Sequence, residues 1–345
     1  MDFFLLPGPV FATCDEITSK EAFDLDIRFL HRSHDAGFDG VAINHHYASG
    51  PLAQTFQPIP LAGHIMARYP DLYVMTAVFI LPYHNPIEIA EQVATLDVMA
   101  PGKLIFGVGQ GYRPDEGDAL GIDHKSRPGR MRESIAAMRL LWQDGPASFE
   151  GEYYNFRDID IGLRPVNPKG PPIVVAADKP HTIARIPGLG EEVHWLPSSR
   201  HSRSFLREAM EIYRRALDTA GRPYAGLPLQ RAIAVADDER AAAELVKKSF
   251  TRLLHIQHSW NQPGERLDLP FEELVKDRMI IGSPDQVAAQ LVSLHREFGV
   301  ECFIFQQYMP GMDPGAALEM IDRVGREVVP LVRSEVDERP SLFDR

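Results

Sequence analysis

The chain has 345 residues, of which 44% are apolar, and a formal net charge of -12. This length allows one large α/β barrel or two domains. The acidic balance and the lack of a basic run argue against nucleic-acid binding. The N-terminal segment lacks the positive region of a signal peptide, and no apolar segment reaches the roughly 20 residues that span a bilayer. We therefore expect a cytoplasmic protein with neither a nucleic-acid nor a membrane partner.

Short apolar runs alternate with longer segments of helical periodicity along the chain. The predicted strands are Phe3–Leu6, Val41–Asn44, Leu72–Ile80, Lys103–Val108, Pro172–Ala176, Val193–Leu196, Leu229–Ala236 and Cys302–Gln306. The predicted helices are Ala22–Ala36, Leu61–Tyr69, Pro86–Ala100, Pro128–Trp142, His181–Ile186, Ser202–Ala220, Asp238–Ile256, Pro284–Phe298 and Pro314–Val332. Near-continuous apolar strands are typical of parallel sheets covered on both faces. Eight such units predict a single α/β domain over residues 1–345, a (β/α)8 TIM barrel with its site at the carboxyl ends of the strands; a doubly wound sheet is the alternative.

Two segments interrupt the repeat. Residues 147–163 alternate aromatic and polar side chains around a glycine, which predicts an inserted β-hairpin. Residues 259–280 have mixed charge and a Pro-Gly pair, which predicts a long loop or a lid over the site.

The fourth predicted strand runs into three glycines, Gly107, Gly109 and Gly111, with Gln110 and Tyr112 beside them. Small residues past the end of a strand let backbone N–H groups approach a flat or anionic ligand. The dinucleotide-binding fingerprint requires different glycine spacing at the first strand–helix turn. We therefore interpret this segment as a ligand-binding loop of a barrel, with an ordinary tight turn as the alternative.

The second predicted strand ends in Asn44, His45 and His46. Adjacent side chains of an extended chain point to opposite sides, so the two histidines cannot easily chelate one metal. One of them can line the barrel mouth and act as a general acid or base; alternatively, both are hydrogen-bonded core or loop residues. Two histidine pairs on predicted helices lack further ligands at recognisable spacing, so no metal site is predicted.

The fifth predicted strand leads to Asp178, Lys179 and Thr182 at the start of a helix. Free N–H groups and the positive dipole end make a helix N-terminus a candidate phosphate site. Ordinary N-capping by Asp178 is the alternative. On the sixth strand, Trp195 is expected either in a pocket wall or in the core.

Four segments in this order resemble the bacterial luciferase-like family of flavin-dependent monooxygenases, which are (β/α)8 barrels. Residues 38–46 resemble its strand ending in Glu-His-His, and residues 75–86 its third strand with the following helix start. Residues 91–111 resemble its helix, turn and flavin loop, and residues 282–300 its eighth-unit signature. Asn44 stands where the family often has Glu, and Gln110 where some members have a phosphate-binding Arg.

The resemblance implies roles for particular residues. His45 matches the family's catalytic histidine beside the flavin, and Ala77-Val78 matches a non-proline cis peptide against the flavin ring. Arg113 or Lys179 is expected to replace the missing phosphate-binding Arg. The implied cofactor-binding residues are Asn44, Ala77, Val78, Gly109, Gln110, Gly111, Tyr112, Arg113, Val175, Asp178, Thr182 and Trp195.

The resemblance also implies an activity. The expected enzyme is a homodimer that takes reduced FMN from a separate flavin reductase and uses O2 to oxygenate a small organic substrate. One alternative is an F420-dependent hydride-transfer oxidoreductase on the same barrel. A second alternative is a flavin-binding protein without catalytic turnover.

Overall fold

The computed structural model describes residues 1–8, 16–50, 53–260, 265 and 268–344. Its main sheet has the order β11-β10-β12-β1-β2-β3-β5-β8-β9, and β4 pairs with β5. Each of these pairings is parallel. The strands are β1 (Asp2–Leu6), β2 (Gly40–Ile43), β3 (Tyr73–Thr76), β4 (Phe79–Ile80), β5 (Leu104–Gly109), β8 (Ile173–Ala176), β9 (Val193–Leu196), β10 (Leu227–Val235), β11 (Met279–Gly282) and β12 (Val300–Gln306).

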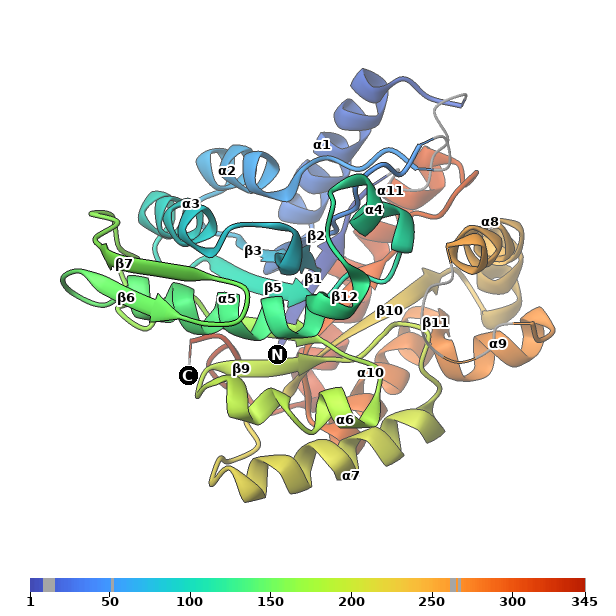
Figure 1. The fold of residues 1–345 in the computed structure, drawn as a ribbon. Coiled ribbons are helices and arrows are strands. Elements are labelled where there is room, and N and C mark those ends of the chain that lie inside the picture. The colour runs from blue at the N-terminus through green and yellow to red at the C-terminus, as the bar shows by residue number, and fades with distance from the viewer. Residues whose placement is uncertain (9–15, 51–52, 261–264, 266–267, 345) are drawn as a thin grey trace.

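The sheet curls into a barrel because β9, at one end of this order, packs against β10 near the other end. Helices surround the strands on the outside (Figure 1). Each of the eight predicted strands has a counterpart in the sheet, whereas β11 is an added strand beside the C-terminal half of β10. The fold is thus the predicted (β/α)8 barrel.

The helices are α1 (Ser19–Asp35), α2 (Pro58–Arg68), α3 (Pro86–Met99), α4 (Pro114–Ala119), α5 (Arg127–Leu141), α6 (Pro180–Ile183), α7 (Arg203–Thr219), α8 (Glu239–Ser259), α9 (Phe271–Arg278), α10 (Pro284–Phe298), α11 (Pro314–Arg323) and α12 (Val329–Glu335). Local sequence sets several of their starts. Thr18 with Glu21 and Ser283 with Gln286 form capping boxes at α1 and α10. Across the described residues, no helix has the length and apolar character needed to cross a membrane.

Alternate residues of the strands build two apolar layers. Phe3 and Leu5 of β1 belong to the large cluster shared with the helices. Phe4 lies in a second cluster with side chains from other barrel strands, such as Met75 and Ile105. Successive side chains of a strand point to opposite faces of the sheet. In a barrel, one set therefore fills the interior and the other packs against the surrounding helices.

Both predicted interruptions of the repeat fall largely on described residues. Between residues 147 and 163, β6 (Ala147–Glu150) pairs antiparallel with β7 (Asn155–Ile159). The expectation of a loop over residues 259–280 is wrong for its second half, which forms α9 and the start of β11. Acidic side chains in the first turn of α9 and basic ones in its last turn complement the helix dipole. Residues 261–264 and 266–267, where the lid was also predicted, lie outside the described residues.

Candidate functional site

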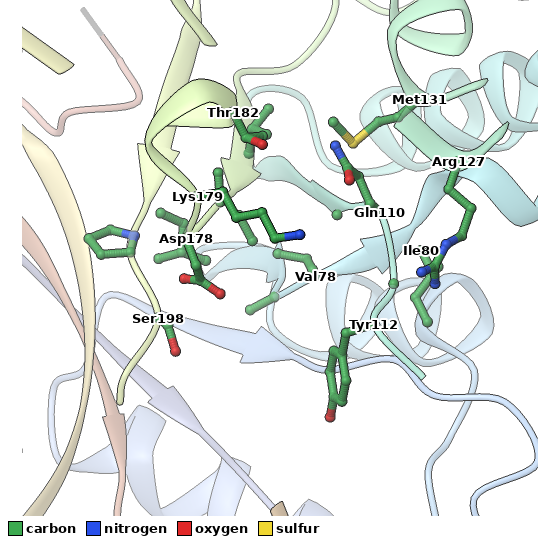
Figure 2. A pocket seen from close by; sticks show the side chains of 18 of the residues that line it. Val78, Ile80, Gln110, Tyr112, Arg127, Met131, Asp178, Lys179, Thr182 and Ser198 are labelled. Atoms are coloured by element: carbon green, nitrogen blue, oxygen red, sulfur yellow. The ribbon is translucent and has the colours of Figure 1, made fainter. Parts of the chain in front are cut away.

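A cavity of about 630 Å³ lies at the carboxyl ends of the barrel strands. This volume is within the range of small-molecule sites, roughly 300–1,000 Å³. Figure 2 shows the side chains of Val78, Gln110 and Lys179 around it. The cavity brings together most of the residues predicted from the sequence, namely Asn44, His45, Ala77, Val78, Gly109, Gln110, Gly111, Tyr112, Val175, Asp178 and Thr182.

One wall of the cavity is formed where the predicted third strand divides into β3 and β4. The peptide bond between Ala77 and Val78, in this gap, is cis, as the resemblance implied. A Cβ atom on Gly107 would lie 1.8 Å from the carbonyl oxygen of Thr76, which leaves no room for a side chain. Position 107 therefore needs glycine because its backbone packs against Thr76. The predicted reason, the close approach of a ligand to the backbone, does not apply at this position.

Both ring nitrogens of His45 have partners. The backbone N–H of Ile80 donates to Nδ1 at 3.1 Å, so this nitrogen carries no hydrogen. Nε2 therefore carries the hydrogen and donates it to Oε1 of Gln57 at 3.1 Å. Burial, followed by the positive charge that His84 would carry, lowers the pKa of His45 to about 3. A neutral and fully bonded imidazole joins the ends of β2 and β4 but is poorly suited to the expected proton transfer.

His46 also lines the cavity. The prediction that adjacent histidines point to opposite sides does not apply, because β2 ends at Ile43 and residues 44–46 are not extended strand. His46 Nδ1 lies 2.9 Å from Oε1 of Glu116, a carboxylate with a fully buried side chain. Within the described ranges, no cluster of three or more His, Cys, Asp or Glu side chains is placed to hold a metal ion.

Cationic side chains form a second wall, although the chain as a whole is acidic. Arg127 donates to the hydroxyl of Tyr83 at 3.3 Å and contacts His124. Burial is the largest cause that lowers the pKa of His124, and the positive charges of Arg127 and Lys179 lower it further. The segments that carry Arg127 and Lys179 therefore contribute to one positive region. The cationic residues that line the cavity are Lys125, Arg127, Arg132, Lys179 and Arg185. Their chemistry fits a phosphate or another anion.

The sequence reading missed most of this cationic wall. It placed the phosphate at the start of the helix after the fifth strand, but α6 has only four residues. A signal was nevertheless present at α5, which begins with Arg127 and has no acidic residue in its first turn. Cations at a helix N-terminus oppose the helix dipole, so their presence there indicates a bound anion or another function.

Asp178 lies beside the cationic wall and lines the same cavity. Burial raises its pKa to about 6, and its Oδ1 lies 3.3 Å from Nε2 of the fully buried His201. The alternative that Asp178 caps the following helix is wrong, since Lys179 occupies the N-cap position and makes no side-chain cap.

Two predicted cofactor residues lie outside the cavity lining. Trp195 is 0% exposed, and its Nε1 donates to the carbonyl oxygen of Ala177 at 2.8 Å, so it is a core residue. Arg113 is 7% exposed and donates to Glu116 and to backbone oxygens of the loop after β2. These contacts hold Arg113 outside the cavity lining, whereas Arg127, although 3% exposed, is part of it.

Comparisons with known proteins agree with the fold. A family model described as luciferase-like monooxygenase matches residues 12–302. An F420-dependent glucose-6-phosphate dehydrogenase of Segniliparus rotundus is 26% identical over 313 residues, which cover 86% of this chain and 90% of the relative.

Solved structures show the same architecture. The monooxygenase RslO1 from Streptomyces bottropensis has a TM-score of 0.84 at 22% identity and covers 96% of this chain and 99% of its own. The oxygenating constituent of 3,6-diketocamphane monooxygenase from Pseudomonas putida, in complex with FMN, has a TM-score of 0.78 at 20% identity, with 96% and 98% coverage. The chain belongs to the luciferase-like monooxygenase family and is an oxidoreductase built on a (β/α)8 barrel.

Proposed function

We propose that the protein is a monooxygenase that uses reduced FMN and O2 to oxygenate a small, uncharged organic substrate. One observation favours this function over that of an enzyme that binds both an anionic cofactor and an anionic substrate. Among the described residues that line the cavity, Lys and Arg side chains occur only in segments 125–132 and 179–185. One positive region suits the single phosphate of FMN and leaves the rest of this described lining, which has no Lys or Arg, for the substrate.

The remaining lining residues fit the other parts of FMN. Val78 and Ile80 line the cavity beside the glycine loop, because Gly109 and Gly111 carry no side chains that would displace them, and this wall would face a flat ring. Arg127, Lys125 and Lys179 would hold the phosphate. When bound, reduced FMN supplies the electrons for oxygen chemistry, while the protein positions the reactants and excludes water.

A second candidate is an F420-dependent hydride-transfer enzyme, which the name of the Segniliparus rotundus relative favours. If the substrate were a sugar phosphate, it would bring a second anion into the cavity. Outside the two cationic segments, the described part of the cavity lining, including Asn44, Gln257 and Gln306, contains no Lys or Arg for it. Arg200 and Arg278 line a separate small pocket that shares Gln257 and Gln306. We also expect a homodimer and a separate flavin reductase, by resemblance to the family. The alternative of a flavin binder without turnover gains no support from the relative's name.

Anaerobic titration distinguishes the two cofactors. The full-length protein is titrated with reduced FMN and, separately, with reduced F420, and air-saturated buffer is then admitted to each mixture. We expect tight binding of reduced FMN and protein-dependent oxygen uptake, with weaker binding of reduced F420. Binding of F420 alone, with no effect on oxygen uptake, would replace the proposed function by hydride transfer.

A further inference from the structure

Glu116 is the centre of a buried hydrogen-bond cluster beside the cavity. Its side chain is 0% exposed, although it sits on the short helix α4 close to the molecular surface. Oε1 accepts the backbone N–H of Tyr47 at 3.2 Å and Nη1 of Arg113 at 3.2 Å. Donors of this kind stabilise negative charge on the oxygen that accepts them.

Arg113 fixes this carboxylate to the loop that follows β2. Its Nη1 donates to the carbonyl oxygen of Tyr47 at 3.1 Å, and its Nη2 donates to that of Ala48 at 3.3 Å. The guanidinium also lies over the ring of Trp260, 4.5 Å from the centroid. Arg113 and Glu116 therefore hold α4 and residues 46–48 in one arrangement.

His46 is the cavity-lining member of this cluster. Because Oε1 of Glu116 is an acceptor, the Nδ1 atom 2.9 Å away must carry the hydrogen of the neutral imidazole. Nε2 then has a lone pair with no hydrogen-bond partner among the described residues. The ring is held from the sides by Trp260, at 4.8 Å between centroids, and by Tyr112, at 5.7 Å.

The neighbouring histidine has the opposite arrangement. His45 accepts at Nδ1 from Ile80 and donates at Nε2 to Gln57, so both its nitrogens are occupied. Of the two adjacent histidines, His46 alone combines a buried carboxylate partner on one nitrogen with a second nitrogen that is available for proton exchange. This is the arrangement by which a carboxylate orients an imidazole as an acid or base.

We propose that His46 is the proton-transferring residue of this enzyme and that Glu116 and Arg113 are its positioning residues. The nature of the reaction rests on the function proposed above. In monooxygenation, one oxygen atom of O2 enters the substrate and the other leaves as water, with two electrons from the anionic form of reduced FMN. The balance requires one further proton. His46 takes this proton from solvent at Nε2, and Glu116 stabilises the imidazolium so formed. Nε2 then delivers the proton to the departing oxygen, which returns the ring to its neutral Nδ1–H form.

The tautomers of the two histidines in the cofactor-free protein test the geometry directly. Protein labelled with ¹⁵N-histidine is studied by long-range ¹H–¹⁵N correlation under mildly alkaline conditions, with signals assigned through His45→Gln and His46→Gln. We expect the Nδ1–H tautomer for His46 and the Nε2–H tautomer for His45. In Glu116→Gln, the His46 signals should move toward a mixture of tautomers. An Nε2–H tautomer of His46 in the unsubstituted protein would overturn the proposal, whatever the cofactor.

Chemical rescue tests the proton transfer. Reduced FMN bound to the protein is mixed with O2 without substrate, so that O2, one proton and the reduced flavin give oxidised flavin and hydrogen peroxide. We expect His46→Gly to slow this oxidation about 100-fold, to keep FMN affinity, and to recover when imidazole is added. Glu116→Gln should slow it less, and the exposed His64→Gln on α2 should leave it unchanged.

The two experiments separate this inference from the function on which it rests. Unimpaired oxidation in His46→Gly, or a loss that imidazole does not restore, would overturn the role of His46 while leaving the monooxygenase proposal intact. If neither the unsubstituted protein nor the variants bind reduced FMN, the proposed function fails. The tautomers would then still decide whether Glu116 orients His46.

Discussion

Val78 packs so closely against Gly109 that a Cβ atom at position 109 would lie 2.6 Å from Cγ2 of Val78. The cavity wall that faces the proposed flavin ring is therefore shaped by a residue on each of two neighbouring segments. Val78 keeps its position only while position 109 has no side chain.

Gly109→Ala is expected to displace Val78 and to weaken FMN binding. Overpacking of this kind costs about 1–3 kcal/mol of stability. Gly63→Ala on α2 is the matched control, because its Cβ would meet Leu96 and Met99 at 3.6 and 3.8 Å, which are ordinary contacts. Urea unfolding and flavin titration of both variants check the prediction. Equal FMN affinity in the two variants would show that the Val78 wall does not contact the ring.

Arg127→Gln is expected to weaken binding of FMN but not of riboflavin, because only FMN carries a phosphate. Charged hydrogen bonds contribute about 1.5–3 kcal/mol, so the dissociation constant for FMN should rise about 10- to 100-fold. Arg157→Gln, on the exposed face of β7, is the control that preserves affinity for both. A similar loss of riboflavin affinity would mean that Arg127 supports the cavity and not the phosphate.

Asp178 is expected to destabilise the protein at neutral pH. Its folded pKa of about 6 lies above the ordinary 3.8, so the folded state holds the carboxyl proton more tightly than the unfolded state. The stability that protonation provides is present below about pH 4 and is lost as pH rises through about 6. The difference corresponds to about 3 kcal/mol at most.

Asp178→Asn removes this dependence. We expect urea unfolding to show that the variant is more stable than the unsubstituted protein at pH 8. The difference between their free energies of unfolding should shrink as the pH falls toward 4. A difference that stays constant with pH would contradict the raised pKa of Asp178.

Buried histidines act in the opposite direction. Burial lowers the pKa of His45 to about 3, of His84 to about 4 and of His201 to about 3, below the ordinary 6.5. Below pH 6.5, these histidines bind protons in the unfolded state but not in the folded state. Each is therefore expected to lower the free energy of unfolding by about 1.4 kcal/mol per pH unit. In urea unfolding, His201→Gln should flatten this acid loss by one proton. An unchanged slope would indicate that His201 becomes protonated in the folded protein.

The strands were predictable because each barrel strand is a short apolar run between turn residues. Residues 173–176 and 193–196, for example, fall within or coincide with the predicted ranges. The added strand β11 was missed because Met279–Gly282 directly follows a charged segment. In that segment, acidic residues come before basic ones, an order that favours the helix α9. The mixed charge was instead interpreted as a sign of a loop.

The site was predictable where a residue follows a barrel strand, as Asn44, Gln110 and Asp178 do. It was not predictable where tertiary contacts decide the role of a side chain. His45 is occupied by Ile80 and Gln57, which are distant in sequence, and only the folded chain shows that its ring has no free nitrogen. Arg127 resembles any charged residue of an amphipathic helix until the fold brings it to the cavity.

A crystal structure of the protein prepared with FMN tests the central claim most directly. We predict that the flavin ring lies against Val78, with the phosphate within hydrogen-bonding distance of Arg127 and Lys179 and with open space next to His46. A flavin ring elsewhere in the barrel, or a cavity that takes up F420 and excludes FMN, would contradict the assignment of this cavity to FMN-dependent oxygenation.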